Sequence, residues 1–201
     1  MKKNIDLKTL FVTSSLFLGI ALLTLFYYKS LPNQMAIHFD VHGKPNQFIS
    51  KFLATVITPV VLFLLHIILC VSYDLKGITH IPIVRVVKWS VPIITCVIQV
   101  AQLIYNLGGH IDYRRLVVIT LALGYIILGN YMPKDVERSS GSEKNRKVRR
   151  QTGYLFVMGG FFLLLSLFGP VESSIFVLVL LGLVVIVWSM MHFLTGSKNS
   201  V

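Results

Sequence analysis

The residues with the clearest capacity for chemistry are His38, Asp40 and His42, which stand at alternate positions in one short polar segment. Alternate side chains of an extended chain point to the same face, so this segment would present two imidazoles and a carboxylate together. Such a set could bind zinc with an open fourth position, but no further ligand or general base stands at the spacing of a known metal enzyme. The other interpretations are a polar strip that satisfies turn backbone or meets water, and a surface that meets a peptide from outside the cell. We therefore expect no bound metal and no cofactor.

The sequence carries no catalytic pattern elsewhere. It has no nucleophile elbow, no phosphate-binding glycine loop, no His-Glu-x-x-His and no paired carboxylates. The sequence therefore predicts a protein that is not an enzyme.

The segments that must position the polar strip are long and apolar. Apolar residues make up 55% of the chain and charged residues only 13%, and the charges are clustered. A helix needs about 20 apolar residues to cross a bilayer core, and six windows meet or approach that length. These windows are 11–28, 52–73, 89–107, 116–132, 154–169 and 175–194. The sequence therefore predicts an all-α membrane protein with about six transmembrane helices and a short structured outer loop between the first two.

Few polar side chains fall inside these windows. Positions 175–188 lack the polar stripe that a water-facing helix needs, which argues against a soluble helical bundle. No Asp, Glu, Lys or Arg lies near the middle of a window, which argues against a proton-coupled or ion-coupled pump. We expect Gln99 and Gln102 to form interhelical hydrogen bonds, with a polar pocket as the alternative. We interpret His66 as a hydrogen-bonded packing residue, with an ionisable relay as the alternative.

The positive charge is distributed unevenly along the chain. The formal net charge is +11 at pH 7. If the amino terminus is cytoplasmic, fourteen of the nineteen Lys and Arg residues fall in inner segments and five in outer segments. Cytoplasmic segments of membrane proteins carry the excess of Lys and Arg, so we expect a multi-pass protein with both termini in the cytoplasm.

The most basic segment is 133–153, which we predict to be a cytoplasmic loop that fixes the topology and touches anionic lipid head groups. Arg146, Lys147, Arg149 and Arg150 would make these contacts, or would bind a cytoplasmic protein. We expect no nucleic-acid partner, because no recognition fold fits in so short a loop. The predicted organisation has four parts. A first helix pair with the outer loop 29–51 occupies 1–73, and a second helix pair occupies 74–132. The basic loop follows at 133–153, and a C-terminal helix hairpin with a tail occupies 154–201.

The outer loop 29–51 has the sequence marks of a compact structure. Pro32 begins a turn after the first span, and positions 35–41 then alternate between polar and apolar as in a short strand. Gly43 belongs to a second turn, and Ser50 is a candidate N-cap for the second span. We therefore expect a folded element at the membrane surface.

Two segments of the chain resemble the SdpI family of membrane proteins. The outer-loop part of that family follows a pattern of Leu-Pro, His-Phe, Gly and Ser-Lys, and a Gly-Asn-x-x-Pro-Lys element ends its fourth span. The matching residues here are Leu31, Pro32, His38, Phe39, Gly43, Ser50 and Lys51, followed by Gly129, Asn130, Pro133 and Lys134. After Lys134 the chain departs from the family, since 135–144 replaces its usual Asn, Gly-Ile-Arg-Thr and Trp-Thr elements. The resemblance implies a protein of the bacterial plasma membrane.

The resemblance also implies a function. It implies immunity to a secreted killing peptide of sporulating bacilli, and retention of a cytoplasmic repressor at the membrane when the peptide is present. We expect the chain to give immunity or resistance to a secreted antimicrobial peptide that contacts the outer loop. The alternatives are a small transporter or channel component, and a membrane-tethered regulator of unknown ligand. The loop residues expected to serve this function are His38, Phe39, Asp40, His42, Gly43, Asn46, Phe48, Ser50 and Lys51.

Overall fold

Long apolar helices dominate the computed structural model, which describes residues 5–79, 81–135 and 143–197. Five helices are long and apolar enough to cross a membrane, judged by length and composition. They are Leu7–Ser30, Leu53–Leu75, Pro82–Asn106, Tyr113–Lys134 and Val171–Trp188. The protein is therefore an α-helical, multi-pass membrane protein, as the sequence predicts, and it carries one small antiparallel sheet.

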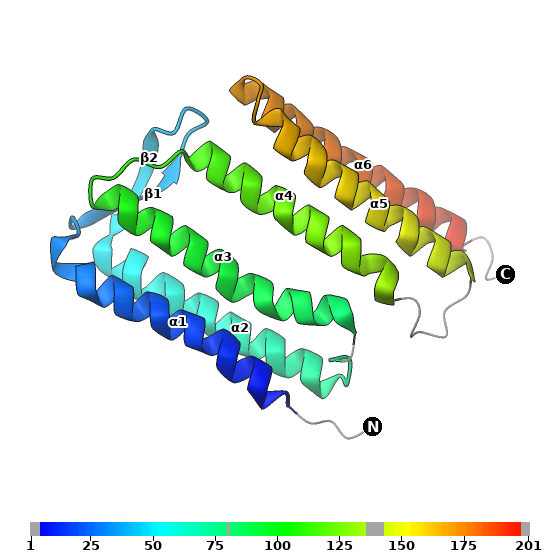
Figure 1. Ribbon diagram of the computed structural model, residues 1–201, viewed down its shortest axis with the longest axis horizontal. Helices are drawn as coiled ribbons and strands as arrows, with labels where there is room; N and C mark the ends of the chain where they lie inside the picture. Colours follow the sequence, from blue (N-terminus) through cyan, green and yellow to red (C-terminus); the bar gives the residue numbers. More distant parts are fainter. Residues whose placement is uncertain (1–4, 80, 136–142, 198–201) are drawn as a thin grey trace.

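Six helices and two strands make up the described chain (Figure 1). The helices are α1 (Leu7–Tyr27), α2 (Thr58–Leu75), α3 (Pro82–Asn106), α4 (Tyr113–Tyr131), α5 (Glu143–Ser166) and α6 (Val171–Ser197). The strands β1 (Gln34–Phe39) and β2 (Pro45–Ser50) form a hairpin between α1 and α2. Three short helical turns, η1 (Tyr28–Ser30), η2 (Leu53–Ile57) and η3 (Met132–Asp135), extend α1, precede α2 and follow α4.

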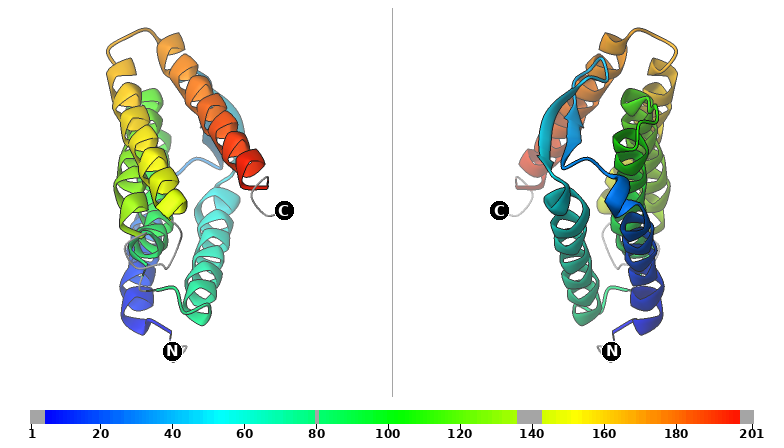
Figure 2. Two further views of the ribbon diagram at one scale, coloured as in Figure 1. Left: turned by 90° about the vertical axis from the view of Figure 1, so that its right-hand side faces the viewer. Right: turned by 90° about the vertical axis from the view of Figure 1, so that its left-hand side faces the viewer.

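The helices run up and down, so their connections gather at two ends of the molecule (Figure 1). The hairpin, the α3–α4 connection and the α5–α6 turn share one end, which we call the hairpin end. The start of α1, the α2–α3 connection and the end of α6 lie at the opposite end, which we call the terminal end. Side views show the hairpin standing beyond the start of α2 (Figure 2).

The first three helices pack around a core that also holds the hairpin. Met35 of β1 is fully buried there, against Ile20 of α1, Ala54 of η2 and Leu103 of α3. The folded element predicted between the first two spans is therefore present, and Met35 packs it into the core of the helical unit. A separate core, formed by Val118, Ala122, Leu163 and Leu181, joins α4, α5 and α6.

Small residues let α4 and α5 approach each other closely. A Cβ added to Gly153 would lie 2.6 Å from the carbonyl oxygen of Gly129, and one added to Gly160 would lie 2.7 Å from that of Ala122. Small residues at helix contacts in membranes allow such close approach of two backbones. Pro133 also lies against Gly153, so Gly129 and Pro133 of the family-like element build this contact.

Arg114 ties α4 to the other helices at the hairpin end. Its Nη2 donates to the carbonyl oxygens of Ser166, Gly169 and Pro170 at 2.9–3.0 Å, and to Ser174 Oγ at 3.0 Å. The last carbonyls of a helix lack partners within the helix, and a guanidinium supplies donors to several of them at once.

The basic segment differs in part from its predicted form. The described chain resumes at Glu143 as helix α5, so 143–153 belongs to a helix and not to a loop, while 136–142 lies outside the described residues. No Pro interrupts this stretch, and Lys and Arg are good helix formers, so the apolar helix that follows extends backwards through it. Arg146, Lys147, Arg149 and Arg150 are exposed along it. Because of these charges, α5 is not among the five helices that are long and apolar enough to cross a membrane.

Candidate functional site

The turn of the hairpin is organised by Asp40. Its carboxylate Oδ1 accepts hydrogen bonds from the backbone N–H of Lys44 at 2.8 Å and of His42 at 2.9 Å. The Lys44 hydrogen bond is the larger cause of a lowered pKa for the Asp40 carboxyl. Gly43 supplies the left-handed backbone that the turn requires, at φ +76°. Short Asp side chains close turns in this way by bonding the backbone a few residues on.

This turn overturns the extended strip predicted for His38, Asp40 and His42. Strand β1 ends at Phe39, so His38 lies in the strand while Asp40 and His42 belong to the turn region, and the strip is not extended throughout. The Nδ1 of His38 lies 2.6 Å from Asn46 Oδ1 across the hairpin, while the Asp40 carboxylate is engaged by the turn. Within the ranges that the structure describes, no group of three His, Cys, Asp or Glu side chains is placed to hold a metal ion.

The hairpin is clamped to α3 by Asn106. The N–H of Ala36 donates to Asn106 Oδ1 at 2.9 Å, and Asn106 Nδ2 donates to the Ala36 carbonyl oxygen at 3.2 Å. Nδ2 also donates to the carbonyl oxygen of Gln102 at 2.8 Å, which fixes the amide on its own helix. The Asn106 amide thus pairs with the backbone of β1 on the side away from β2, as a neighbouring strand would. The sequence did not predict this contact.

An aromatic cluster supports the end of β1. The Phe39 ring stacks on Tyr113 at 3.6 Å between centroids and meets Tyr105 edge-on at 4.7 Å. The Tyr113 hydroxyl donates to the carbonyl oxygen of Ala101 at 3.1 Å, which fixes the cluster to α3. Phe39, predicted as a peptide contact, is placed by the structure as an anchor of the hairpin.

The other end of the hairpin is anchored by Lys51. Its Nζ donates to the carbonyl oxygens of Tyr28 at 3.4 Å and Leu31 at 3.3 Å, and lies 4.8 Å from the centroid of the Tyr28 ring. Leu31 itself is buried in the core of the first three helices. Ser50 Oγ accepts from the N–H of Leu53 at 3.4 Å, as an N-cap does. The family-like residues at this end therefore hold the hairpin in place.

The predicted loop residues thus fall into three groups. The anchors are Leu31, Phe39, Ser50 and Lys51, and the turn residues are Asp40 and Gly43. The exposed residues are Pro32, His38, His42, Asn46 and Phe48. Phe48 stands out among them, because it is a large apolar residue and is 54% exposed. The exposed group is the part of the hairpin that a ligand could touch.

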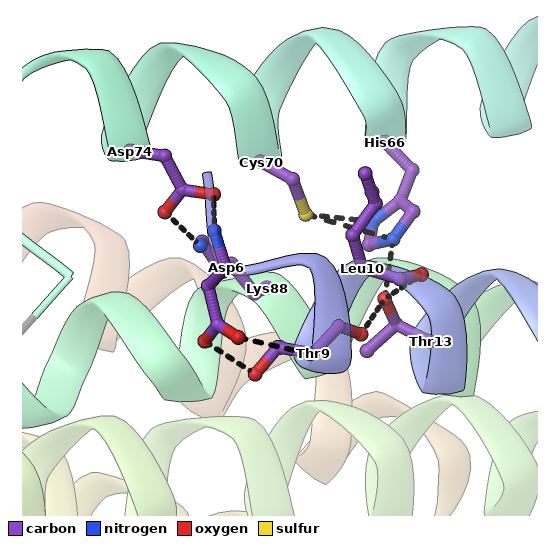
Figure 3. A network of polar contacts seen from close by, with 8 residues as sticks. All are labelled: Asp6, Thr9, Leu10, Thr13, His66, Cys70, Asp74 and Lys88. Carbon is purple, nitrogen blue, oxygen red and sulfur yellow. Dashed lines mark hydrogen bonds and ion pairs between the residues drawn. The ribbon is translucent and has the colours of Figure 1, made fainter. Parts of the chain in front are cut away.

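A second polar cluster lies at the terminal end, between α1, α2 and α3 (Figure 3). Asp74 of α2 and Lys88 of α3 form a direct ion pair, and their residues are only 1% and 2% exposed. Asp74 Oδ2 also accepts from the backbone N–H of Asp6 at 3.1 Å. One buried carboxylate therefore joins the starts of α1 and α3 to the end of α2.

The cluster continues along α1 and α2 (Figure 3). Asp6 caps α1 by accepting from the N–H and the hydroxyl of Thr9, and the hydroxyl bond is the larger cause of a lowered pKa for Asp6. Deeper in the bundle, His66 Nε2 lies 2.9 Å from Thr13 Oγ1, and the Cys70 sulfur lies 3.6 Å from the same ring nitrogen. His66 is fully buried, so its interpretation as a hydrogen-bonded packing residue is confirmed.

A third polar contact joins α3 to the start of the second span. Gln99 Nε2 donates to the carbonyl oxygen of Ala54 at 3.2 Å, so the interhelical hydrogen bond predicted for Gln99 is confirmed. The Asp74–Lys88 pair, by contrast, was missed. The sequence did contain a signal for this ion pair, because Asp74 is the sole acid between the second and third apolar windows and is the nearest candidate partner for a basic residue there.

Comparison with protein families places the hairpin inside a recognised region. Residues 16–63 match the family described as Domain of unknown function (DUF1648). This DUF1648-like region runs from within α1, through the whole hairpin, into α2. Comparison with curated proteins and with solved structures found no match.

The clamp on the DUF1648-like region gives a direct prediction. Replacing Asn106 with alanine is expected to favour local opening of β1 by about 1–3 kcal/mol, because the N–H and C=O of Ala36 lose their partners. Hydrogen exchange of positions 34–39 should accelerate while that of α1 stays unchanged. His110→Ala removes an exposed side chain from the connection that follows the same helix, and serves as the control. Equal exchange in the two variants would contradict the clamp.

Proposed function

We propose that this chain is a non-enzymatic immunity or resistance protein of the SdpI type, which protects a bacterial plasma membrane against a secreted antimicrobial peptide. The peptide is bound at the exposed face of the hairpin. The observation that carries the proposal is the anchored hairpin itself, which lies in a region matching DUF1648, a domain that occurs in SdpI-like membrane proteins.

The contacts of the hairpin support a binding role. Asn106, the Phe39 cluster and Lys51 hold its two ends, so the exposed side chains project from a fixed platform. Binding residues held on rigid supports lose little entropy when a ligand arrives. Phe48 offers a large apolar contact beside the polar side chains of His38 and Asn46, the mixture that peptide-binding surfaces use.

The arrangement in the membrane follows from the charges. The segments at the terminal end carry most of the Lys and Arg, and this supports a cytoplasmic position for that end and an outer position for the hairpin. A secreted peptide would then meet the hairpin before it reaches the helices. Retention of a repressor is not part of the proposal, because the family's pattern after Lys134 is replaced in this chain.

The proposal is tested by survival. A bacterium sensitive to the sporulation-delaying killing peptide is made to express the chain and is challenged with that purified peptide. We expect survival to rise at least about tenfold, and the triple variant His38→Ala, Asn46→Ala and Phe48→Ala to lose most of this gain, since truncating central contact residues costs about 2 kcal/mol or more. Phe168→Ala removes an exposed aromatic side chain from the same end of the molecule, and should protect fully.

Expression of each variant in the membrane is measured by immunoblot, so that loss of protein is not mistaken for loss of binding. Unchanged survival with the wild-type chain would refute the immunity function for this peptide. Full protection by the triple variant would refute the hairpin as the binding site.

A further inference from the structure

The two edges of the hairpin differ in how they are covered. The outer side of β1 packs on α3, and Asn106 occupies the N–H and C=O of Ala36 there. Strand β2 is exposed along positions 46–48, and in the side view it forms the free flank of the hairpin (Figure 2, right). The sheet therefore has one closed edge and one open edge.

The register shows which backbone groups face the open edge. Ala36 pairs with Phe48, and Ala36 directs its N–H and C=O away from β2, toward Asn106. In an antiparallel pair such a residue belongs to a non-hydrogen-bonded pair, so its partner also directs both groups outward. The N–H of Lys51 donates to the carbonyl oxygen of Asn33 at 2.9 Å, three positions along, which fits the same alternation.

Phe48 therefore presents a backbone donor and a backbone acceptor to the open edge. By this register neither group bonds to β1, and no hydrogen bond from another element to either group is found in the part of the chain that the structure describes. The ladder is irregular on the turn side of this position, because the register shifts between Ala36 and His38 and again before Phe39. Unpaired N–H and C=O groups on an exposed strand are a template for a further strand.

These groups decide the class of ligand. A helix satisfies its backbone internally and a lipid acyl chain has no donors, whereas an extended peptide offers an acceptor and a donor at matching spacing. The charge at the turn refines the choice. Asp40 is engaged by the turn N–H groups, while Lys44 is exposed at the same end of β2. A negative group on the ligand would complement Lys44 there.

We propose that the open edge of β2 binds an extended peptide segment by strand addition at Phe48, with an apolar side chain on the Phe48 ring and an acidic group toward Lys44. This deepens the proposed function and rests on it, because it specifies how a secreted peptide would be held on the hairpin. The backbone hydrogen bonds supply affinity for extended chains, and the ring and the lysine supply selectivity.

The test uses a short synthetic peptide of alternating threonine and valine with a glutamate at one end, added to the full-length chain in lipid nanodiscs. Exchange of the Phe48 amide hydrogen is followed by NMR after labelling the phenylalanines with ¹⁵N. We expect exchange to slow at least about tenfold with the peptide, as it does for an amide that becomes hydrogen-bonded. An analogue N-methylated at every residue should give no slowing, and a lysine in place of the glutamate should weaken binding.

A pair of variants separates the backbone from the ring. Phe48→Pro removes the outward N–H without breaking a ladder bond, as edge strands allow, whereas Phe48→Ala keeps the N–H and removes the ring. If strand addition is correct, Phe48→Pro binds the peptide at least about fivefold more weakly than Phe48→Ala. This difference corresponds to the loss of roughly one hydrogen bond. Equal binding by the two variants, or unchanged exchange in the wild-type chain, would overturn the inference.

Two further outcomes are informative. Slow exchange of Phe48 without peptide, together with a dimer in the nanodisc, would assign the edge to a second copy of this chain and overturn the inference. Failure of the survival assay with a positive result here would remove the immunity function and leave the strand-binding edge intact. If the chain protects cells in the survival assay but the peptide does not slow exchange of the Phe48 amide, the immunity function stands and strand addition is refuted.

Discussion

Substitution of Asp74 by alanine is expected to lower the free energy of unfolding by about 3–5 kcal/mol, because it leaves the Lys88 ammonium buried without its counter-ion. The pair is almost completely shielded from solvent, and no other acid forms an ion pair with Lys88 among the residues that the structure describes. The Asp6 N–H loses its acceptor at the same time. The loss is measured by equilibrium unfolding in mixed micelles.

The control for this variant is Arg85→Ala. Arg85 lies on α3 about one turn before Lys88 and is exposed, so its removal should change stability by no more than about 0.5 kcal/mol. The double variant Asp74→Leu with Lys88→Met removes both charges and should recover most of the loss, since an apolar pair of similar size needs no counter-ion. A loss for Asp74→Ala no larger than that for Arg85→Ala would show that the ion pair does not stabilise the bundle.

The membrane-spanning architecture was predictable because it depends on local composition. A charge-free window of sufficient length has few alternatives to a helix in lipid, and the windows correspond closely to the observed helices. The limits of this reasoning appear where charges adjoin a span. Lys88 and Asp74 were placed just outside the apolar windows, but the structure buries both inside helices. A window average cannot distinguish a charge that meets solvent from one that meets a partner on another helix.

The hairpin shows the same division between local and distant information. Its turns were predictable from Pro32 and from Gly43 with its neighbours, because turn chemistry acts over a few residues. The end of β1 was misjudged, since polar alternation continues through Asp40 and only the hydrogen bonds of its carboxylate reveal the turn. The clamp from Asn106 was not predictable, because it lies 70 residues from Ala36 in the chain. Without it the open edge at Phe48 could not be assigned.

Enlarging Gly153 is expected to separate α4 from α5. An added Cβ would lie 2.6 Å from the carbonyl oxygen of Gly129 and 3.0 Å from Pro133, and neither group can move without displacing a helix. We expect Gly153→Ala to destabilise the protein by about 1–3 kcal/mol, and Gly153→Val by more, because forcing atoms into a packed contact displaces backbone. Unfolding in mixed micelles measures the loss.

Gly124→Ala provides the control, since Gly124 lies on α4, the helix that Gly153 of α5 contacts, and a Cβ there meets no atom within 4 Å. It should be neutral or slightly stabilising, because alanine favours a helix over glycine by about 1 kcal/mol. If Gly153→Ala proves as stable as Gly124→Ala, the close approach of α4 and α5 is not what holds the second half of the bundle together. The family-like residues Gly129 and Pro133 would then need a role other than packing.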